Sequence, residues 1–125
     1  MASFARILLV EDDAALRCAL SELLRENGYE VACATDGRDA LAQLGTRPAP
    51  SVILLDLVMP VMDGWAFRAE QRRDPLLAAI PTIVISASLA ADRRRLEELE
   101  PAATLAKPFE IERLIATVRR ICVSC

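Results

Sequence analysis

The sequence has no histidine, few aromatic residues and almost no lysine. Phe, Trp and Tyr make up 4% of the 125 residues, and Lys107 is the single lysine among 15 basic residues. Without an imidazole, every mechanism that requires a histidine within this chain is excluded. The chain also lacks the basic surplus that nucleic-acid binding usually shows, since 18 acidic residues give a net charge of −3. We therefore expect no nucleic-acid partner.

Long apolar runs are missing as well. No run approaches the roughly 18 residues of a membrane span, and no charged region with a long apolar stretch opens the chain. We therefore expect a soluble, cytoplasmic protein with no membrane partner. Cys122 and Cys125 have the CxxC spacing of a redox pair. A helix C-terminus disfavours the reactive thiolate, so we interpret the four scattered cysteines as reduced, incidental thiols.

The residues that are present suit one compact domain. A length of 125 residues is typical of a single domain. The apolar fraction of 54%, mostly Ala, Leu, Ile and Val, argues against intrinsic disorder. We expect a single domain over residues 1–125, with no separate effector domain.

Short apolar runs alternate with helical patterns along the chain. Such runs are typical of strands that are covered on both faces of a parallel sheet. We predict strands at residues 7–10, 31–34, 52–55 and 82–85 and around Leu105. We predict helices from the N-cap Asp13 to Gly28, and at residues 37–44, 65–73, 92–99 and 111–122. This order indicates an α/β fold, a flavodoxin-like doubly wound (βα)5 sandwich with a five-stranded parallel sheet of order 2-1-3-4-5.

The residues that end these strands carry complementary chemistry. In open α/β sheets, ligands bind at the carboxyl ends of the strands. Clustered carboxylates without His or Cys suit a hard cation such as Mg²⁺, and a cation, an ammonium and a hydroxyl together suit phosphoryl oxygens. A carboxylate can itself accept the phosphoryl group. The strand-end residues are Glu11, Asp12, Asp13, Asp56, Ser86 and Lys107.

Each of these residues alone has a simpler explanation. An aspartate after a strand is commonly a cap or turn residue, and a lysine before proline is commonly a solvated loop residue. Complementary groups at four strand ends are much harder to explain in that way. In a chain that otherwise uses arginine, the single lysine, Lys107, also lies at this edge, where a compact ammonium acts as a point charge on phosphate.

The chain resembles the receiver domain of two-component response regulators over essentially its full length. The resemblance depends on several motifs in a fixed order and spacing. They are ILLVEDD at 7–13, VILLDLVMP at 52–60, MDG at 62–64, PTIVISA at 81–87 and LAKPF at 105–109.

The resemblance implies a role for each matching residue. Asp56 would be the phosphoacceptor, and Lys107 and Ser86 would bind phosphoryl oxygens. Ala87 would leave room for the phosphoryl group. Mg²⁺ would be held by Asp12, Asp56 and the backbone carbonyl of Val58, with Glu11 acting partly through water.

The implied function is a signalling switch rather than a metabolic enzyme, with only self-catalysed phosphotransfer and dephosphorylation. A sensor histidine kinase or a histidine phosphotransfer protein would supply the phosphoryl group, and phosphorylation would change contacts with a downstream protein target. We expect a monomer or a weak dimer. Thr104 departs from the family, which often has an aromatic ring three residues before the lysine, so the usual route of signal transmission is in doubt.

Several alternatives stay open. The chain could be a stand-alone receiver or a receiver excised from a larger protein such as a hybrid kinase. A receiver that binds partners without phosphorylation is another possibility. A haloacid dehalogenase-like phosphatase also uses a strand-end aspartate, but it needs a carboxylate two residues later, where this chain has Val58. The arginines at 93–95 could form a docking surface or a solvated face that pairs with nearby glutamates.

Overall fold

A five-stranded parallel sheet forms the centre of the protein. The computed structural model of the 125-residue chain describes residues 5–46, 48–87 and 93–123. The sheet has the order β2-β1-β3-β4-β5, as the sequence predicts. Its strands are β1 (Arg6–Val10), β2 (Glu30–Ala34), β3 (Val52–Asp56), β4 (Thr82–Ser86) and β5 (Ala103–Ala106).

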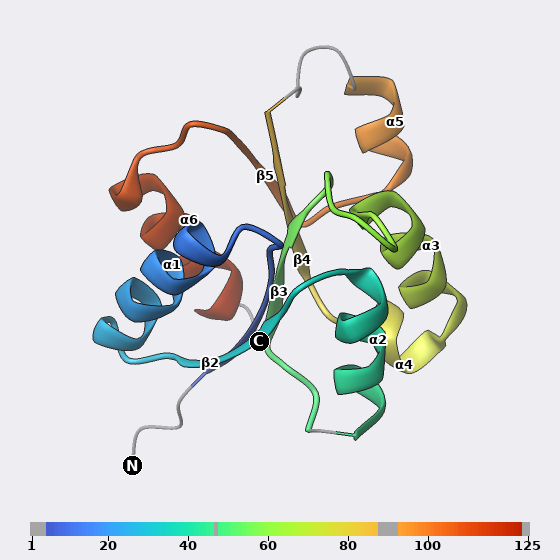
Figure 1. Ribbon diagram of the computed structural model, residues 1–125, viewed down its shortest axis with the longest axis horizontal. Helices are drawn as coiled ribbons and strands as arrows, with labels where there is room; N and C mark the ends of the chain where they lie inside the picture. Colours follow the sequence, from blue (N-terminus) through green and yellow to red (C-terminus); the bar gives the residue numbers. More distant parts are fainter. Residues whose placement is uncertain (1–4, 47, 88–92, 124–125) are drawn as a thin grey trace.

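Helices cover both faces of this sheet (Figure 1). Helices α1 and α6 lie together on one face, and α2 and α3 lie on the other. Among the described residues, none of the helices is both long and apolar enough to cross a membrane. The helices are α1 (Ala14–Glu26), α2 (Gly37–Thr46), α3 (Gly64–Arg73), α4 (Pro75–Ala78), α5 (Arg93–Glu98) and α6 (Ile111–Val123).

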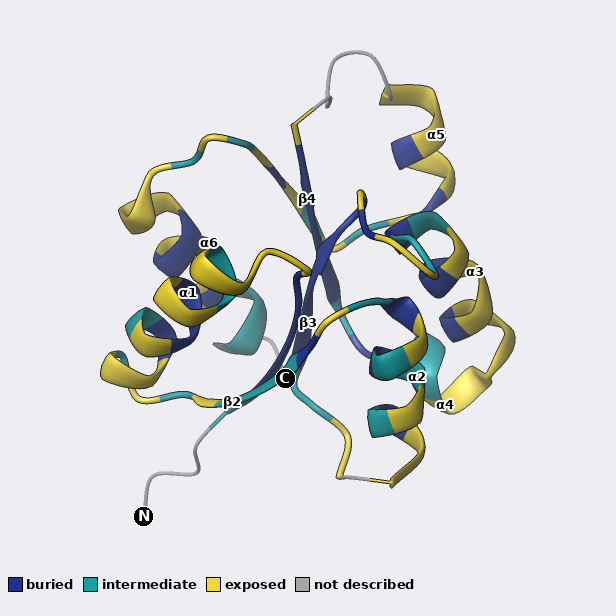
Figure 2. Ribbon diagram, in the orientation of Figure 1, coloured by how far each residue is buried: buried dark blue, intermediate teal, exposed yellow. Residues whose placement is uncertain are grey.

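The central strands β1, β3 and β4 are buried on both faces, whereas the edge strands β2 and β5 are partly exposed (Figure 2). Successive side chains of a strand point to opposite faces. Ile7 and Leu9 therefore pack with the α1 and α6 residues, whereas Leu8 and Val10 pack with the α2 and α3 residues. A third, smaller cluster lies beneath α5. It contains Leu57, Val84, Leu96 and Leu99, with Trp65 packed against it.

The predicted signals at the two ends of the first helix are confirmed. The side chain of Asp13 accepts a hydrogen bond from the Leu16 N–H at 3.2 Å and caps α1. Gly28, two residues after the end of α1, has a φ of +92°, which favours glycine. Phe67, on the inward face of α3, is fully buried.

Some predicted helix boundaries are wrong. Helix α2 continues through Gly45 to Thr46, because the glycine lies within the helix rather than ending it. The short helix α4 was not predicted and directly follows the predicted helix at 65–73. Asp74 caps α4, and Pro75 occupies its first turn, where its missing N–H costs nothing. The predicted helical residue Asp92 lies outside the described residues.

Candidate functional site

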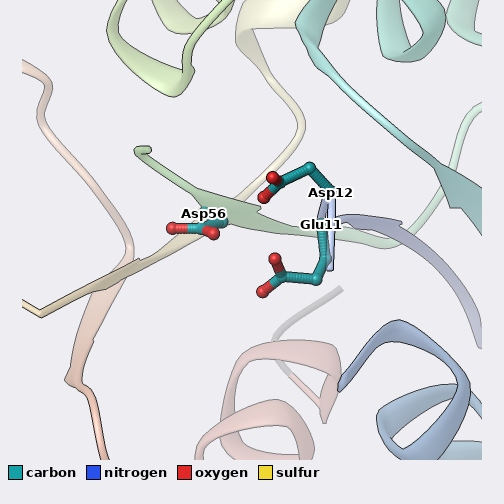
Figure 3. A group of neighbouring side chains, drawn as sticks. All are labelled: Glu11, Asp12 and Asp56. Atoms are coloured by element: carbon teal, nitrogen blue, oxygen red, sulfur yellow. The ribbon is translucent and has the colours of Figure 1, made fainter. Parts of the chain in front are cut away.

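Three carboxylates gather at the carboxyl ends of β1 and β3. One oxygen from each of Glu11, Asp12 and Asp56 lies within 4.8 Å of the others, and Figure 3 shows the three side chains around one spot. Glu11 and Asp56 are only 2% and 5% exposed, whereas Asp12 faces solvent. Strands β1 and β3 are adjacent, so the ends of the two strands bring these residues together as the sequence predicts.

Lys107 joins this cluster from the end of β5. Its ammonium donates hydrogen bonds to Asp56 Oδ2 at 3.1 Å and to Glu11 Oε1 at 3.2 Å. The Lys107 N–H also donates to the Ser86 carbonyl at 2.9 Å, which fixes the backbone at the lysine. The peptide bond between Lys107 and Pro108 is cis. A single cation is therefore shared by two buried carboxylates.

The crowding of charge alters two pKa values. Burial, together with the charge of Asp56, raises the pKa of Glu11 from 4.5 to about 7, although the Asp13 N–H and Lys107 act in the opposite direction. Burial alone would lower the pKa of Lys107. Its hydrogen bonds and charge interactions with Asp56 and Glu11 outweigh burial and raise that pKa, so the ammonium stays protonated.

Backbone contacts fix the orientation of the carboxylates. The Asp13 N–H donates to Glu11 Oε2 at 3.1 Å, and the Val58 N–H donates to Asp56 Oδ1 at 3.2 Å. Arg17, which the sequence analysis did not single out, donates from Nη1 to the Glu11 carbonyl at 2.8 Å. No sequence motif marks Arg17, because it contacts a backbone carbonyl and not a particular side chain. The contact also depends on the conformation of the turn between β1 and α1.

Gly64 lets α3 approach the carboxyl end of β3 closely. Its N–H donates to the Leu57 carbonyl at 3.0 Å. A Cβ at this position would lie 2.6 Å from the Asp56 carbonyl oxygen and 2.7 Å from Leu57 Cα, closer than real Cβ contacts allow. Glycine is therefore required by backbone packing beside Asp56.

The other predicted site residues have different surroundings. Ser86 is buried at the end of β4, next in sequence to Ile85, which pairs with Asp56. Ala87 is exposed and, with Lys107, lines one end of an apolar groove along α1. The Val58 side chain is 75% exposed, so its backbone is the part that faces the carboxylate. Thr104 is exposed on β5.

The donor set fits magnesium better than a softer metal. Glu11, Asp12 and Asp56 offer only carboxylate oxygens, and such oxygens suit a hard divalent cation. The buried carboxylates outnumber the one ammonium that they share. A divalent cation would therefore offset the burial and the nearby charge of Asp56, which together raise the pKa of Glu11.

The raised pKa of Glu11 predicts a change in stability. A carboxyl that binds its proton more tightly in the folded state stabilises the fold below pH 4.5, and this contribution is lost as pH rises through about 7. In metal-free solution at pH 8, Glu11→Gln should raise the free energy of unfolding by about 2 kcal/mol. Urea unfolding from pH 5 to 8 measures this, with the exposed Glu22→Gln as the control. Equal pH slopes for wild type and Glu11→Gln would contradict it.

Comparison with known proteins agrees with this geometry. The family model described as the response regulator receiver domain matches residues 7–119. The chain belongs to the response regulator receiver family. Receiver domains of this family are signalling domains of two-component systems. This membership confirms the resemblance seen in the motifs and the predicted fold.

Curated relatives are longer than this chain. The response regulator PleD of Caulobacter vibrioides is 40% identical over 119 residues, which cover 94% of this chain and 26% of PleD. The DNA-binding dual master transcriptional regulator RpaA of Synechocystis sp. is 35% identical over 118 residues, which cover 93% of this chain and 48% of RpaA. The chain thus spans about half or less of the length of these relatives.

One similar receiver domain of known structure contains a bound magnesium ion. The receiver domain of sensor histidine kinase PA1611 from Pseudomonas aeruginosa was solved with a magnesium ion coordinated in its active-site cleft. It superimposes with a TM-score of 0.88 at 30% identity and covers 97% of this chain and 99% of that chain. In this chain, the corresponding feature is the acidic cluster of Glu11, Asp12 and Asp56.

Proposed function

We propose that this chain is a phosphorylation-operated switch in which Asp56 accepts a phosphoryl group in a magnesium-dependent reaction. The observation that carries the proposal is the ammonium of Lys107, which lies 3.1 Å from Asp56 Oδ2. A buried carboxylate beside a fixed cation is placed to receive a group whose oxygens carry negative charge. Membership of the receiver family supports the same reaction.

The transfer is a substitution at phosphorus. An Asp56 carboxylate oxygen forms a bond to phosphorus, the bond from phosphorus to the donor nitrogen breaks, and the electron pair leaves with that nitrogen. Lys107 hydrogen-bonds a phosphoryl oxygen and holds positive charge beside it. This chain contains no histidine, so a sensor histidine kinase or a histidine phosphotransfer protein supplies the phosphohistidine in trans.

Other residues hold the metal and the product. Glu11, Asp12, Asp56 and the backbone carbonyl of Val58 would hold Mg²⁺, which when bound neutralises charge on the phosphoryl oxygens. The Ser86 hydroxyl would bind a second phosphoryl oxygen. Ala87 adds no side-chain bulk beyond Cβ next to Ser86, which leaves space for the phosphoryl group.

The proposed output is a change in protein contacts. A downstream protein can respond to phosphorylation only if it binds the two states with different affinities. Position 104, where many receivers have an aromatic residue, is an exposed threonine on β5. No ring at this position can therefore turn inward when Asp56 is phosphorylated. The switch must therefore act through other elements that contact the site.

A phosphodonor experiment separates this proposal from its rivals. The protein is incubated with acetyl phosphate and Mg²⁺, and intact mass and phosphate release are followed together. A stoichiometric adduct that decays slowly supports a receiver. In a parallel incubation with the ester p-nitrophenyl phosphate, multiple turnover would instead indicate a phosphatase, although Val58 occupies the position where that chemistry needs a carboxylate. No adduct would indicate a receiver that works without phosphorylation and would overturn the proposal.

A further inference from the structure

The carboxyl end of α5 is held by a buried arginine of α3. Arg68 is 5% exposed. Its Nε donates to the Leu99 carbonyl and its Nη2 to the Glu100 carbonyl, each at 3.0 Å. These carbonyls follow the last turn of α5, where the helix dipole favours a cation. One side chain therefore caps α5 from a different helix.

The same guanidinium also fixes the start of β4. Its Nη1 donates to Gln71 Oε1 at 2.9 Å and to Thr82 Oγ1 at 3.0 Å. All four acceptors of Arg68 are uncharged, and burial lowers its pKa. Removal of the guanidinium would take this donor from the buried Leu99 carbonyl and Thr82 Oγ1, which is more costly than the loss of a surface ion pair.

Further hydrogen bonds hold the carboxyl end of α5 in place. The Leu99 and Glu100 N–H groups donate to the Leu96 and Glu97 carbonyls, both at 3.1 Å. Glu100 has a φ of +49°, a conformation that ends the helix. Arg72, one turn after Arg68, binds the Glu98 carbonyl and the Glu100 carboxylate.

The contact that α3 makes nearer the amino end of α5 is weaker. The guanidinium carbon of Arg95 lies 4.0 Å from the ring centroid of Trp65. Arg95 is exposed and Trp65 is half-buried. An exposed cation–π contact changes an equilibrium by only about two- to fivefold, whereas loss of a charged donor to a buried acceptor changes it by about tenfold or more.

A short apolar path connects α5 to the phosphoacceptor. Leu57 follows Asp56 directly and packs with Leu96, Leu99 and Trp65 in the small cluster beneath α5. Trp65 itself follows Gly64, which contacts the Asp56 and Leu57 backbone. A shift of the backbone at Asp56 therefore reaches Trp65 directly, and reaches Arg95 through its neighbour Leu96, within one layer of side chains.

We propose that Arg68 is a positioning residue that fixes the carboxyl end of α5, and that the contact between Arg95 and Trp65 is the one that changes when Asp56 is phosphorylated. Helix α5 then pivots about its Arg68 anchor rather than moving as a whole. This inference rests on the proposed function, because phosphorylation drives the pivot. The anchor itself exists in the unphosphorylated protein.

The anchor is tested without any phosphoryl group. In Arg68→Met, amide exchange at Leu99 and Glu100, measured by NMR, should be at least about tenfold faster than in wild type. Arg68→Lys should accelerate amide exchange less, since it keeps the charge but loses the several N–H donors of the guanidinium. This variant replaces Arg68→Met in the test if Arg68→Met does not fold. Arg73→Ala is the matched control, because this arginine of α3 is exposed and pairs with Glu70. Equal exchange in the Arg68 variants and in Arg73→Ala would overturn the anchor.

The pivot is tested with beryllofluoride and Mg²⁺ as the phosphoryl mimic. In wild type, Trp65 fluorescence and the amide shifts of residues 93–96 should change, while the exchange rates of Leu99 and Glu100 stay within about twofold. Arg95→Ala should remove most of the Trp65 response and leave the acetyl phosphate adduct intact. Equal responses at both ends of α5, or an unchanged Trp65 response in Arg95→Ala, would overturn the pivot.

The two proposals fail in different ways. If beryllofluoride leaves the amide shifts around Asp56 and Lys107 unchanged and acetyl phosphate gives no adduct, the proposed function is wrong and the pivot is wrong with it. The exchange rates in Arg68→Met still decide whether the anchor exists. If the adduct forms but α5 responds uniformly, only the pivot is overturned.

Discussion

Lys107→Ala should slow phosphorylation by acetyl phosphate at least about 100-fold, the usual effect of removing one preorganised donor from a developing charge. The ammonium lies 3.1 Å from Asp56 Oδ2 and 3.2 Å from Glu11 Oε1. Lys107 is the side-chain cation that the described contacts place beside these two carboxylates. Its removal would leave the phosphoryl oxygens without that positive charge. The rate of adduct formation, followed by intact mass at saturating Mg²⁺, measures this effect.

Magnesium binding should respond in the opposite direction. Loss of the lysine removes a positive charge that competes with the metal for the same carboxylates, so the Mg²⁺ dissociation constant should stay equal or fall. Calorimetric titration of Mg²⁺ checks this, with Lys107→Arg as a variant that keeps the charge. A collapse of metal affinity in Lys107→Ala would show that the lysine maintains the structure of the site instead of binding phosphate.

Gly64→Ala and Gly45→Ala should change stability in opposite directions. A Cβ on Gly64 would lie 2.6 Å from the Asp56 carbonyl oxygen, a backbone atom that cannot move without shifting β3. A Cβ on Gly45 has no neighbour within 4 Å, and this glycine lies inside α2. We expect Gly64→Ala to lower the free energy of unfolding by about 3 kcal/mol. We expect Gly45→Ala to raise it by about 0.5–1 kcal/mol.

Urea unfolding of the two variants beside wild type measures both changes. The two substitutions add the same methyl group, so their difference isolates the effect of the surroundings. Gly64→Ala should also slow the proposed phosphorylation, because it displaces the backbone at Asp56. A Gly64→Ala protein as stable as wild type would show that α3 can move away from Asp56 at little cost.

The sequence was sufficient to predict the sheet and the residues at its carboxyl edge. The order of five apolar runs fixes a parallel sheet, and the residue after each run is then placed at one edge. For this reason Glu11, Asp56 and Lys107 could be brought together from sequence. The sequence could not show that Glu11 is buried while Asp12 is exposed, because both follow the same strand.

The missed features depend on tertiary contacts. The inward face of α3 is formed by Gly64, Phe67, Arg68 and Gln71, which share the helical spacing of a buried stripe. The burial of Arg68 and Gln71 could not be predicted from sequence, since an arginine and a glutamine are normally exposed. Gln71 is the only nearby acceptor among the four described for Arg68, and the others, just after α5 and in β4, lie far away in sequence. The pair Asp74 and Pro75, in contrast, carried a local helix start signal that was available and not used.

The central claim is that Asp56 carries the phosphoryl group, and one intact-mass measurement tests it most directly. Wild type and Asp56→Asn are treated in parallel with acetyl phosphate and Mg²⁺. Asparagine keeps the shape of the side chain and removes the nucleophilic carboxylate. Wild type should gain the mass of one phosphoryl group and Asp56→Asn should gain none. The same gain in both proteins would contradict the assignment of Asp56 as the phosphoacceptor.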